Sequence, residues 1–149
     1  MVECEFPECT TFGAVIRFGI ELEKGTAAIY EELGNDPRLA KGQEPFKMLG
    51  ALHKKRGTLL EDTRREKLNE MILEPIQEMR GEKYIIETKV PPGMDLKAAA
   101  KFAAMAEERS SAFYLDASRV AKMLLAEAAR IMERLGKENL SNKAKLETL

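Results

Sequence analysis

Histidine and cysteine, which hold many protein metals, are scarce in this chain of 149 residues: it has one histidine and two cysteines. His53 is the only histidine, so any mechanism that needs two imidazoles from one chain is excluded. Cys4 and Cys9 lie near the N-terminus, and two thiols alone do not complete a closed metal site. They could form a small redox-active disulfide, but we interpret them as two thiols in a flexible tail.

Long apolar runs and basic blocks are also missing. No apolar stretch approaches the length needed to cross a bilayer, and the first residues do not read as a signal peptide, so we expect a cytoplasmic protein without a membrane partner. The 24 Lys and Arg residues nearly balance the 25 Asp and Glu residues, for a net charge of −1. Without a basic patch, binding to nucleic acid is not expected.

The chain does contain a strongly amphipathic stretch over residues 17–33. Its inward face carries a carboxylate, Glu23, in the middle of apolar positions. Burying a carboxylate costs folding free energy unless a metal, a cation or hydrogen bonds compensate its charge. The residues that share this face at helical spacing are Ile16, Gly19, Ile20, Glu23, Ala27 and Tyr30.

The same pattern returns near the C-terminus over residues 101–117. A constant offset of 84 residues separates Glu23 from Glu107 and Tyr30 from Tyr114. A second block, around Gly50, matches the region around Gly136 with an offset of 86 residues. We therefore interpret the chain as two helical hairpins related by internal duplication and joined by a long crossover, which is a four-helix bundle.

The expected elements follow from caps and breakers. Residues 1–9 read as a tail and 10–149 as one helical domain. Thr10 or Thr11 caps the first helix, and Asp95 caps the third. Pro75 is expected to kink the second helix. The remaining expectations are a first helix ending at 33, a loop to 43, a second helix over 44–80, an extended crossover over 81–94 and a last helix over 137–149.

The turn between the third and fourth helices has no clear signal, because residues 95–135 contain neither Gly nor Pro. Two alternatives stay open. Residues 116–118 could form a tight turn, or one helix could run from 95 to 135 and pack on a second chain as a swapped dimer. Gly136 would then be the first interruption. A homodimer is expected in either case.

Several polar residues fall on the inward faces of the expected helices at matching positions of the repeat. They should meet near the centre of the bundle. A shift in the register of the last segment would bring Glu127 or Glu138 there instead. The expected set is Glu23 and Glu107, His53 and Arg56, and Asn139 and Asn142, with Tyr30 and Tyr114 as packed aromatics whose hydroxyl groups reach the network.

This repeat resembles the rubrerythrin-like branch of the ferritin-like superfamily. The segments EKGTAAIY, from Glu23, and EERSSAFY, from Glu107, are similar to that family's E-x-x-A-x-x-[FI]-Y motif. The segments FKMLGALHKKRGTLLE and MERLGKENLSNKAKLE are similar to its second motif, which normally contains E-x-x-H. The resemblance implies a ferritin-like bundle in which four carboxylates and two imidazoles bind two iron ions.

The iron ligands implied by this resemblance are mostly replaced. His53 stands where the family has Glu, and Arg56 where it has His; Asn139 and Asn142 occupy the corresponding places of the second hairpin. A guanidinium is always charged and repels metal, so Arg56 is expected to pair with the glutamates instead. The chain also lacks the pair of C-x-x-C motifs of a rubredoxin module.

These features predict a ferritin-like protein with a degenerate di-iron site. Glu23, Glu107 and His53 would be vestigial or weak metal ligands, and we expect no cofactor, or iron if one is bound. The leading function is non-catalytic, in binding, assembly or regulation with an unknown protein or small-molecule partner. The alternative is a divergent di-iron oxidoreductase, peroxidase or iron-binding protein. A third is a carrier that uses the vacated core. Fold resemblance alone does not choose among them.

Overall fold

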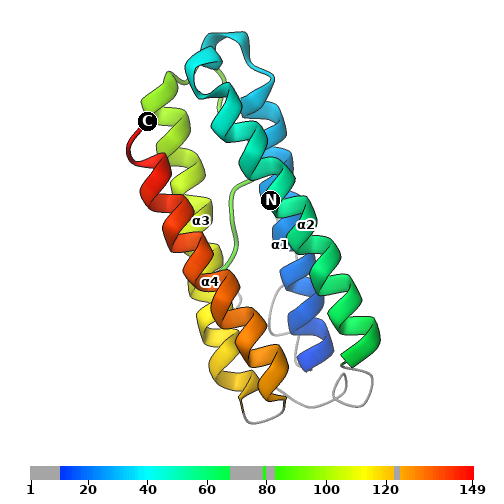
Figure 1. Ribbon diagram of the computed structural model, residues 1–149. Helices are drawn as coiled ribbons and strands as arrows, with labels where there is room; N and C mark the ends of the chain where they lie inside the picture. Colours follow the sequence, from blue (N-terminus) through cyan, green and yellow to red (C-terminus); the bar gives the residue numbers. More distant parts are fainter. Residues whose placement is uncertain (1–10, 68–78, 80–82, 123–124) are drawn as a thin grey trace.

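The computed structural model describes residues 11–67, 79, 83–122 and 125–149 (Figure 1). Within these residues the chain forms four α-helices and one 3-10 helix, with no β-strand, which confirms the predicted all-helical class. None of the described helices is both long and apolar enough to cross a membrane. The elements are α1 (Phe12–Gly34), η1 (Pro37–Gly42), α2 (Gln43–Lys67), α3 (Leu96–Ala121) and α4 (Ala126–Leu146).

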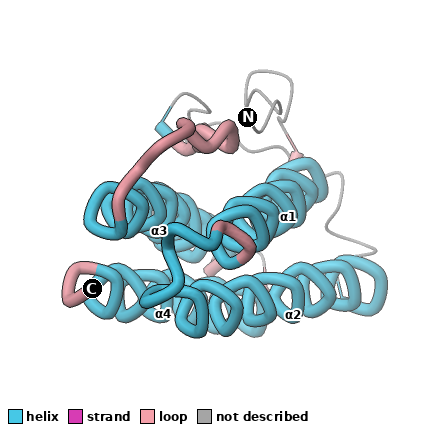
Figure 2. The backbone as a smooth tube through the Cα atoms, turned by 90° about the horizontal axis from the view of Figure 1, so that it is seen from above, coloured by secondary structure: helices cyan, strands magenta, loops and turns pink. Residues whose placement is uncertain are grey.

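The helices pair as two antiparallel hairpins, α1 with α2 and α3 with α4, and each packs mainly within its own hairpin. Seen along the bundle, α1 and α3 form one layer and α2 and α4 the other, and the crossover runs along the α1/α3 side (Figure 2). α1 also packs on α3, which joins the hairpins through the α1/α3 layer.

The predicted caps begin α1 and α3. The Thr11 hydroxyl accepts a hydrogen bond from the Ala14 backbone N–H at 3.2 Å, and the Asp95 carboxylate accepts one from Ala98 at 2.8 Å. Each cap satisfies a backbone donor that has no partner inside its helix. Both predicted caps are confirmed, with Thr11 in preference to Thr10, which lies outside the described residues.

The prediction of one helix over 95–135 is wrong, and so is the alternative turn at 116–118. α3 continues through those residues to Ala121, and α4 begins at Ala126. Tertiary packing ends α3: the turn returns α4 onto α3, where Ser118 Oγ donates to the Ala129 carbonyl at 2.9 Å. A continuous helix would instead carry Ala128 and Met132, both buried here, out of their own bundle.

Gly136 does not interrupt a helix either. It lies inside α4, where a Cβ atom would come within 2.9 Å of Leu115 Cγ. Gly50, at the matching position of α2, faces the Tyr30 Cβ atom, which would lie 3.3 Å from an added Cβ. In both hairpins a glycine therefore allows the two backbones to approach closely.

Two smaller differences concern the connections. The expected loop before α2 contains the 3-10 helix η1, which Asp36 caps through the Arg38 N–H. The predicted kink at Pro75 lies outside the described residues, as do Cys4 and Cys9. The second helix does not reach residue 80 as predicted, because Met79 is described and is not helical. The crossover has neither helix nor strand over residues 85–95, with a bend at residue 89 and a turn at residues 92–93, so it is a connection without a strand, as predicted.

Candidate functional site

A chain of buried polar side chains crosses the centre of the bundle. Glu23 projects from α1, Glu107 from α3 and His53 from α2, and at most 1% of each residue is exposed. His53 lies between the two carboxylates: Nδ1 is 2.5 Å from Glu23 Oε1, and Nε2 is 2.7 Å from Glu107 Oε2. We call the full set of connected side chains the central network: Glu23, Tyr30, His53, Arg56, Glu107, Tyr114, Asn139 and Asn142.

The two short contacts define the charge of His53. A neutral imidazole has one N–H donor, so its other nitrogen would face a carboxylate oxygen lone pair to lone pair; an imidazolium donates from both nitrogens. Burial by itself lowers the pKa of His53, but the hydrogen bonds to Glu107 and Glu23 and their negative charges raise it to about 9. His53 is therefore a buried cation at neutral pH.

Glu107 is correspondingly an anion. Burial favours its neutral form and raises its pKa, but hydrogen bonding and attraction to His53, followed by hydrogen bonds from Tyr30 and Asn139, outweigh burial and hold the pKa below its usual range. The carboxylate accepts four hydrogen bonds. Their donors are His53, Tyr30 at 2.6 Å, Asn139 at 2.6 Å and Asn142 at 3.3 Å.

Each of the two tyrosines donates a hydrogen bond to the glutamate of the other hairpin. Tyr30, from α1, donates to Glu107, and Tyr114, from α3, donates to Glu23. Burial and the neighbouring carboxylates raise the pKa of both phenols, which keeps the hydroxyl groups protonated as donors. The Tyr30 ring also stacks on the His53 ring, with centroids 5.6 Å apart. Each carboxylate is thus bound by a phenol from the opposite hairpin.

Arg56 joins the network from α2. Its Nη2 atom donates to Asn139 Oδ1 at 2.7 Å and lies 3.2 Å from Glu23 Oε2, while its guanidinium carbon lies 5.2 Å from the centre of the Tyr114 ring. Only 3% of the residue is exposed. The guanidinium therefore sits within the polar centre and forms a charge-assisted contact with a carboxylate.

The register of α4 places both asparagines inside, so the alternative of a shifted register is wrong. Glu127 is exposed, and Glu138 lies at the rim, with 41% of its side chain exposed. Glu138 Oε1 is nevertheless 3.7 Å from Arg56 Nη1, an ion pair without a hydrogen bond. In the sequence, this contact was indicated by the place of Glu138 directly before Asn139, an inward-facing residue.

The donor set does not suit a metal centre. Among the residues that the structure describes, no three His, Cys, Asp or Glu side chains are placed so that they could hold a metal ion. Both nitrogens of His53 already face carboxylate oxygens, and Arg56 brings a second fixed positive charge. The two asparagine amides donate to Glu107 and so compete with a metal for its lone pairs.

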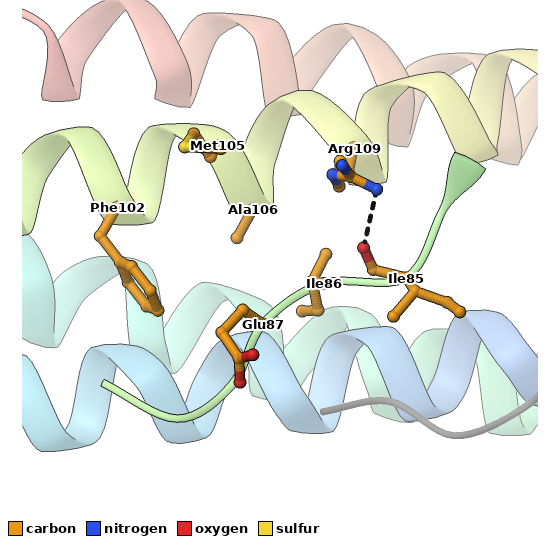
Figure 3. Close-up of a pocket in the computed structure, with 7 residues that line it drawn as sticks. All are labelled: Ile85, Ile86, Glu87, Phe102, Met105, Ala106 and Arg109. Atoms are coloured by element: carbon orange, nitrogen blue, oxygen red, sulfur yellow. Dashed lines mark hydrogen bonds between the residues drawn. The ribbon is translucent and has the colours of Figure 1, made fainter. Parts of the chain in front are cut away.

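A separate groove lies between the crossover and α3, on the α1/α3 side of the bundle (Figure 3). Its volume is about 400 Å³, and Arg109 Nη1 donates to the Ile85 carbonyl at 3.1 Å across it. No member of the central network lines it, so the groove and the network are different features. The lining residues are Ile85, Ile86, Glu87, Phe102, Met105, Ala106 and Arg109.

Comparison with known proteins adds no relative: no protein-family model, no curated protein and no solved structure matches the chain. The resemblance to rubrerythrin-like proteins therefore stays a prediction from the motifs.

Proposed function

We propose that this chain is a ferritin-like bundle in which a buried ion-pair network takes the place of two iron ions, and that it works as a non-catalytic binding, assembly or regulatory protein. The observation that carries the proposal is the position of His53, which bonds Glu23 and Glu107 through its two ring nitrogens. This cation occupies the space between the two carboxylates that correspond to the family's metal ligands.

The charge of the network supports this proposal. Two iron ions bring several positive charges, which four carboxylates normally offset in this family. Here Glu23 and Glu107 are the two carboxylates of the network, and His53 and Arg56 are its two cations, so the charges cancel without metal. Removing either partner of such a buried pair is costly, because it leaves the other charge buried and unpaired. Within the network, Nε and Nη1 of Arg56 are buried without a hydrogen-bond partner, so the guanidinium is held by Nη2 and by ion pairing.

The ligand geometry points the same way. The positions that correspond to E-x-x-H hold His53 and Arg56 on α2 and Asn139 and Asn142 on α4, and all four side chains bond to the glutamates or to each other. The residues present do not fit two iron ions. A divergent oxidoreductase or peroxidase would need ligands from elsewhere and another source of electrons.

The carrier alternative requires a cavity beside the two glutamates. Glu23, Glu107, His53 and Asn139 are each at most 1% exposed and fill the centre with their own hydrogen-bonded side chains. This packing favours a structural network over a ligand chamber.

The test is metal content, measured by mass spectrometry on untagged protein incubated anaerobically with Fe(II). We expect no iron above background. About two iron ions per chain, with an oxo-bridge absorbance after exposure to air, would overturn the proposal.

A restored variant gives the experiment its positive control. The combined substitutions His53→Glu, Arg56→His, Asn139→Glu and Asn142→His recreate the four carboxylates and two imidazoles of the family's site. If this variant folds, as judged by circular dichroism, it should bind about two iron ions. A folded variant that binds none would contradict the ferritin-like placement of these six positions.

A further inference from the structure

An apolar groove opens on the α2/α4 layer of the bundle, on the side away from the crossover. It lies between the beginning of α2 and the end of α4, at the upper end of the molecule in Figure 1. We call it the α2/α4 groove; its volume is about 330 Å³ and its lining residues are Glu44, Pro45, Met48, Leu49, Lys145, Leu146 and Leu149.

The groove is an open edge of the hydrophobic core. Leu49 and Leu146 form its floor and are 8% and 1% exposed, so they belong to the core beneath. Met48 stands on its wall with 67% of the residue exposed, more than Met105 or Leu140, the other large apolar residues on the described surface. Methionine is flexible and adapts to irregular apolar surfaces, which suits an interface.

The two walls of the groove carry charges of opposite sign. Glu44 stands in the first turn of α2 and Lys145 in the last turn of α4, on opposite walls. Among the residues that the structure describes, neither side chain has an ion-pair partner. Each charge lies at the helix end of opposite sign: Glu44 at the positive end of α2 and Lys145 at the negative end of α4.

We propose that the α2/α4 groove binds the same groove of a second copy of this chain, related by a two-fold axis. When that axis runs along the groove, it places Glu44 of each copy opposite Lys145 of the other, so that the interface contains two such pairs. It also places Met48 of each copy against the Leu49 and Leu146 floor of the other. A partner with a charge of one sign would satisfy only one wall, which is why a second copy fits best.

This interface uses the outer surface and does not depend on the proposed function, because no residue of the central network lines the groove. Metal content and oligomeric state can therefore fail separately. The contact also differs from helix swapping, since each chain keeps its own four helices.

The first measurement is sedimentation velocity of the full chain over a range of concentrations, with Met48→Glu compared against Met105→Glu. Both methionines are exposed, so both variants should keep the wild-type helical content. We expect a monomer–dimer equilibrium that Met48→Glu weakens by roughly tenfold or more and that Met105→Glu leaves unchanged. A wild-type chain that stays monomeric at the highest concentration, or a dimer that Met48→Glu leaves intact, would overturn the proposal.

The second measurement tests the two-fold arrangement itself. Glu44→Lys alone places like charges opposite one another, and so does Lys145→Glu alone, so each variant should dimerise more weakly than the wild type. When the two variants are mixed, every contact again joins an acid to a base, and heterodimers should form with near wild-type affinity. If the mixture associates no better than either variant alone, the two copies do not meet in this orientation.

Discussion

The two hairpins of this bundle place the same residues on their first helices and different ones on their second. α1 and α3 each provide a glutamate and a tyrosine to the central network. α2 then adds two cations, His53 and Arg56, while α4 adds two neutral amides, Asn139 and Asn142. All the positive charge of the network therefore comes from one hairpin.

This asymmetry makes each hairpin incomplete without the other. Glu107 lies in the second hairpin, yet the cation that bonds it, His53, comes from the first. The tyrosine bonds cross between the hairpins in both directions. The polar centre therefore specifies how the two halves dock, a role for which buried polar groups are better suited than for adding stability.

The largest expected effect comes from removing the carboxylate of the second hairpin. Glu107→Ala leaves a buried imidazolium and several hydrogen-bond donors without their acceptor, so the free energy of unfolding should fall by about 3–5 kcal/mol. Chemical denaturation measures the loss. Glu108→Ala is the matched control. The Glu108 side chain is largely exposed and makes only a 3.9 Å contact with Lys143, so this substitution should change the free energy of unfolding by no more than about 0.5 kcal/mol. Equal effects of the two substitutions would break the comparison.

The next effect is a pH dependence that arises from the cation of the first hairpin. Its two carboxylate partners raise the pKa of His53 in the folded state to about 9, above the ordinary value of 6.5. A raised pKa stabilises the fold fully below pH 6.5, and this contribution is lost as the pH rises towards 9. The free energy of unfolding should fall by on the order of 1–3 kcal/mol across this window.

Two controls isolate this effect. Cysteine thiols ordinarily titrate near the upper end of this window, so the measurement uses a background with Ser in place of Cys4 and Cys9. His53→Gln in that background should remove most of the slope. Because the chain has one histidine, NMR titration of its imidazole reports the pKa directly, and a value near 6.5 would contradict the buried ion pair.

Alanine substitutions at the matching glycines, Gly136 and Gly50, compare how tightly the two hairpins are packed. Gly136→Ala puts a Cβ atom 2.9 Å from Leu115 Cγ in the second hairpin, and such overpacking should cost about 1–3 kcal/mol. Gly50→Ala meets its nearest neighbour, Tyr30 Cβ, at 3.3 Å, and the better helix propensity of Ala offsets about 1 kcal/mol of the strain. Thermal unfolding should rank Gly136→Ala as the more damaging; the reverse order would show that the first hairpin is the tighter.

The smallest effect concerns hydroxyl groups in the second hairpin. Ser111 donates to the Gly136 carbonyl at 3.0 Å, whereas the matching residue of the first hairpin is Ala27. Ser111→Ala should cost about 1 kcal/mol, the typical value for one hydrogen bond. Thermal unfolding of this variant and of Ser118→Ala checks the estimate, and Ala112→Ser, at an exposed site of the same helix, serves as a neutral control.

The local pattern predicted which residues face inward because helical periodicity is strong over long segments. Glu23 and Glu107 stand out as polar residues within apolar stripes, and helical spacing places His53, Arg56 and the asparagines on the same inward faces. The hydrogen-bond partner of each inward polar side chain was harder to predict from the sequence. Nothing in the spacing states that His53 bridges both glutamates, because that depends on where α3 lies relative to α2.

The turn between α3 and α4 was missed for a related reason. Residues 95–135 have no helix breaker, so local propensity favours one uninterrupted helix. Burial of the apolar face of α4 against α3, with Ser111 and Ser118 bonding to α4 carbonyl groups, outweighs that preference.

Periodicity, caps and the unusual inward polar residues were thus readable from the chain alone, since they depend on neighbours within a few turns of helix. The place where one helix ends, the charge state of His53 and the open edge of the core at Met48 depend on contacts between residues far apart in the chain. Only the packing of the four helices decides these features, because burial and pairing energies arise when the elements meet.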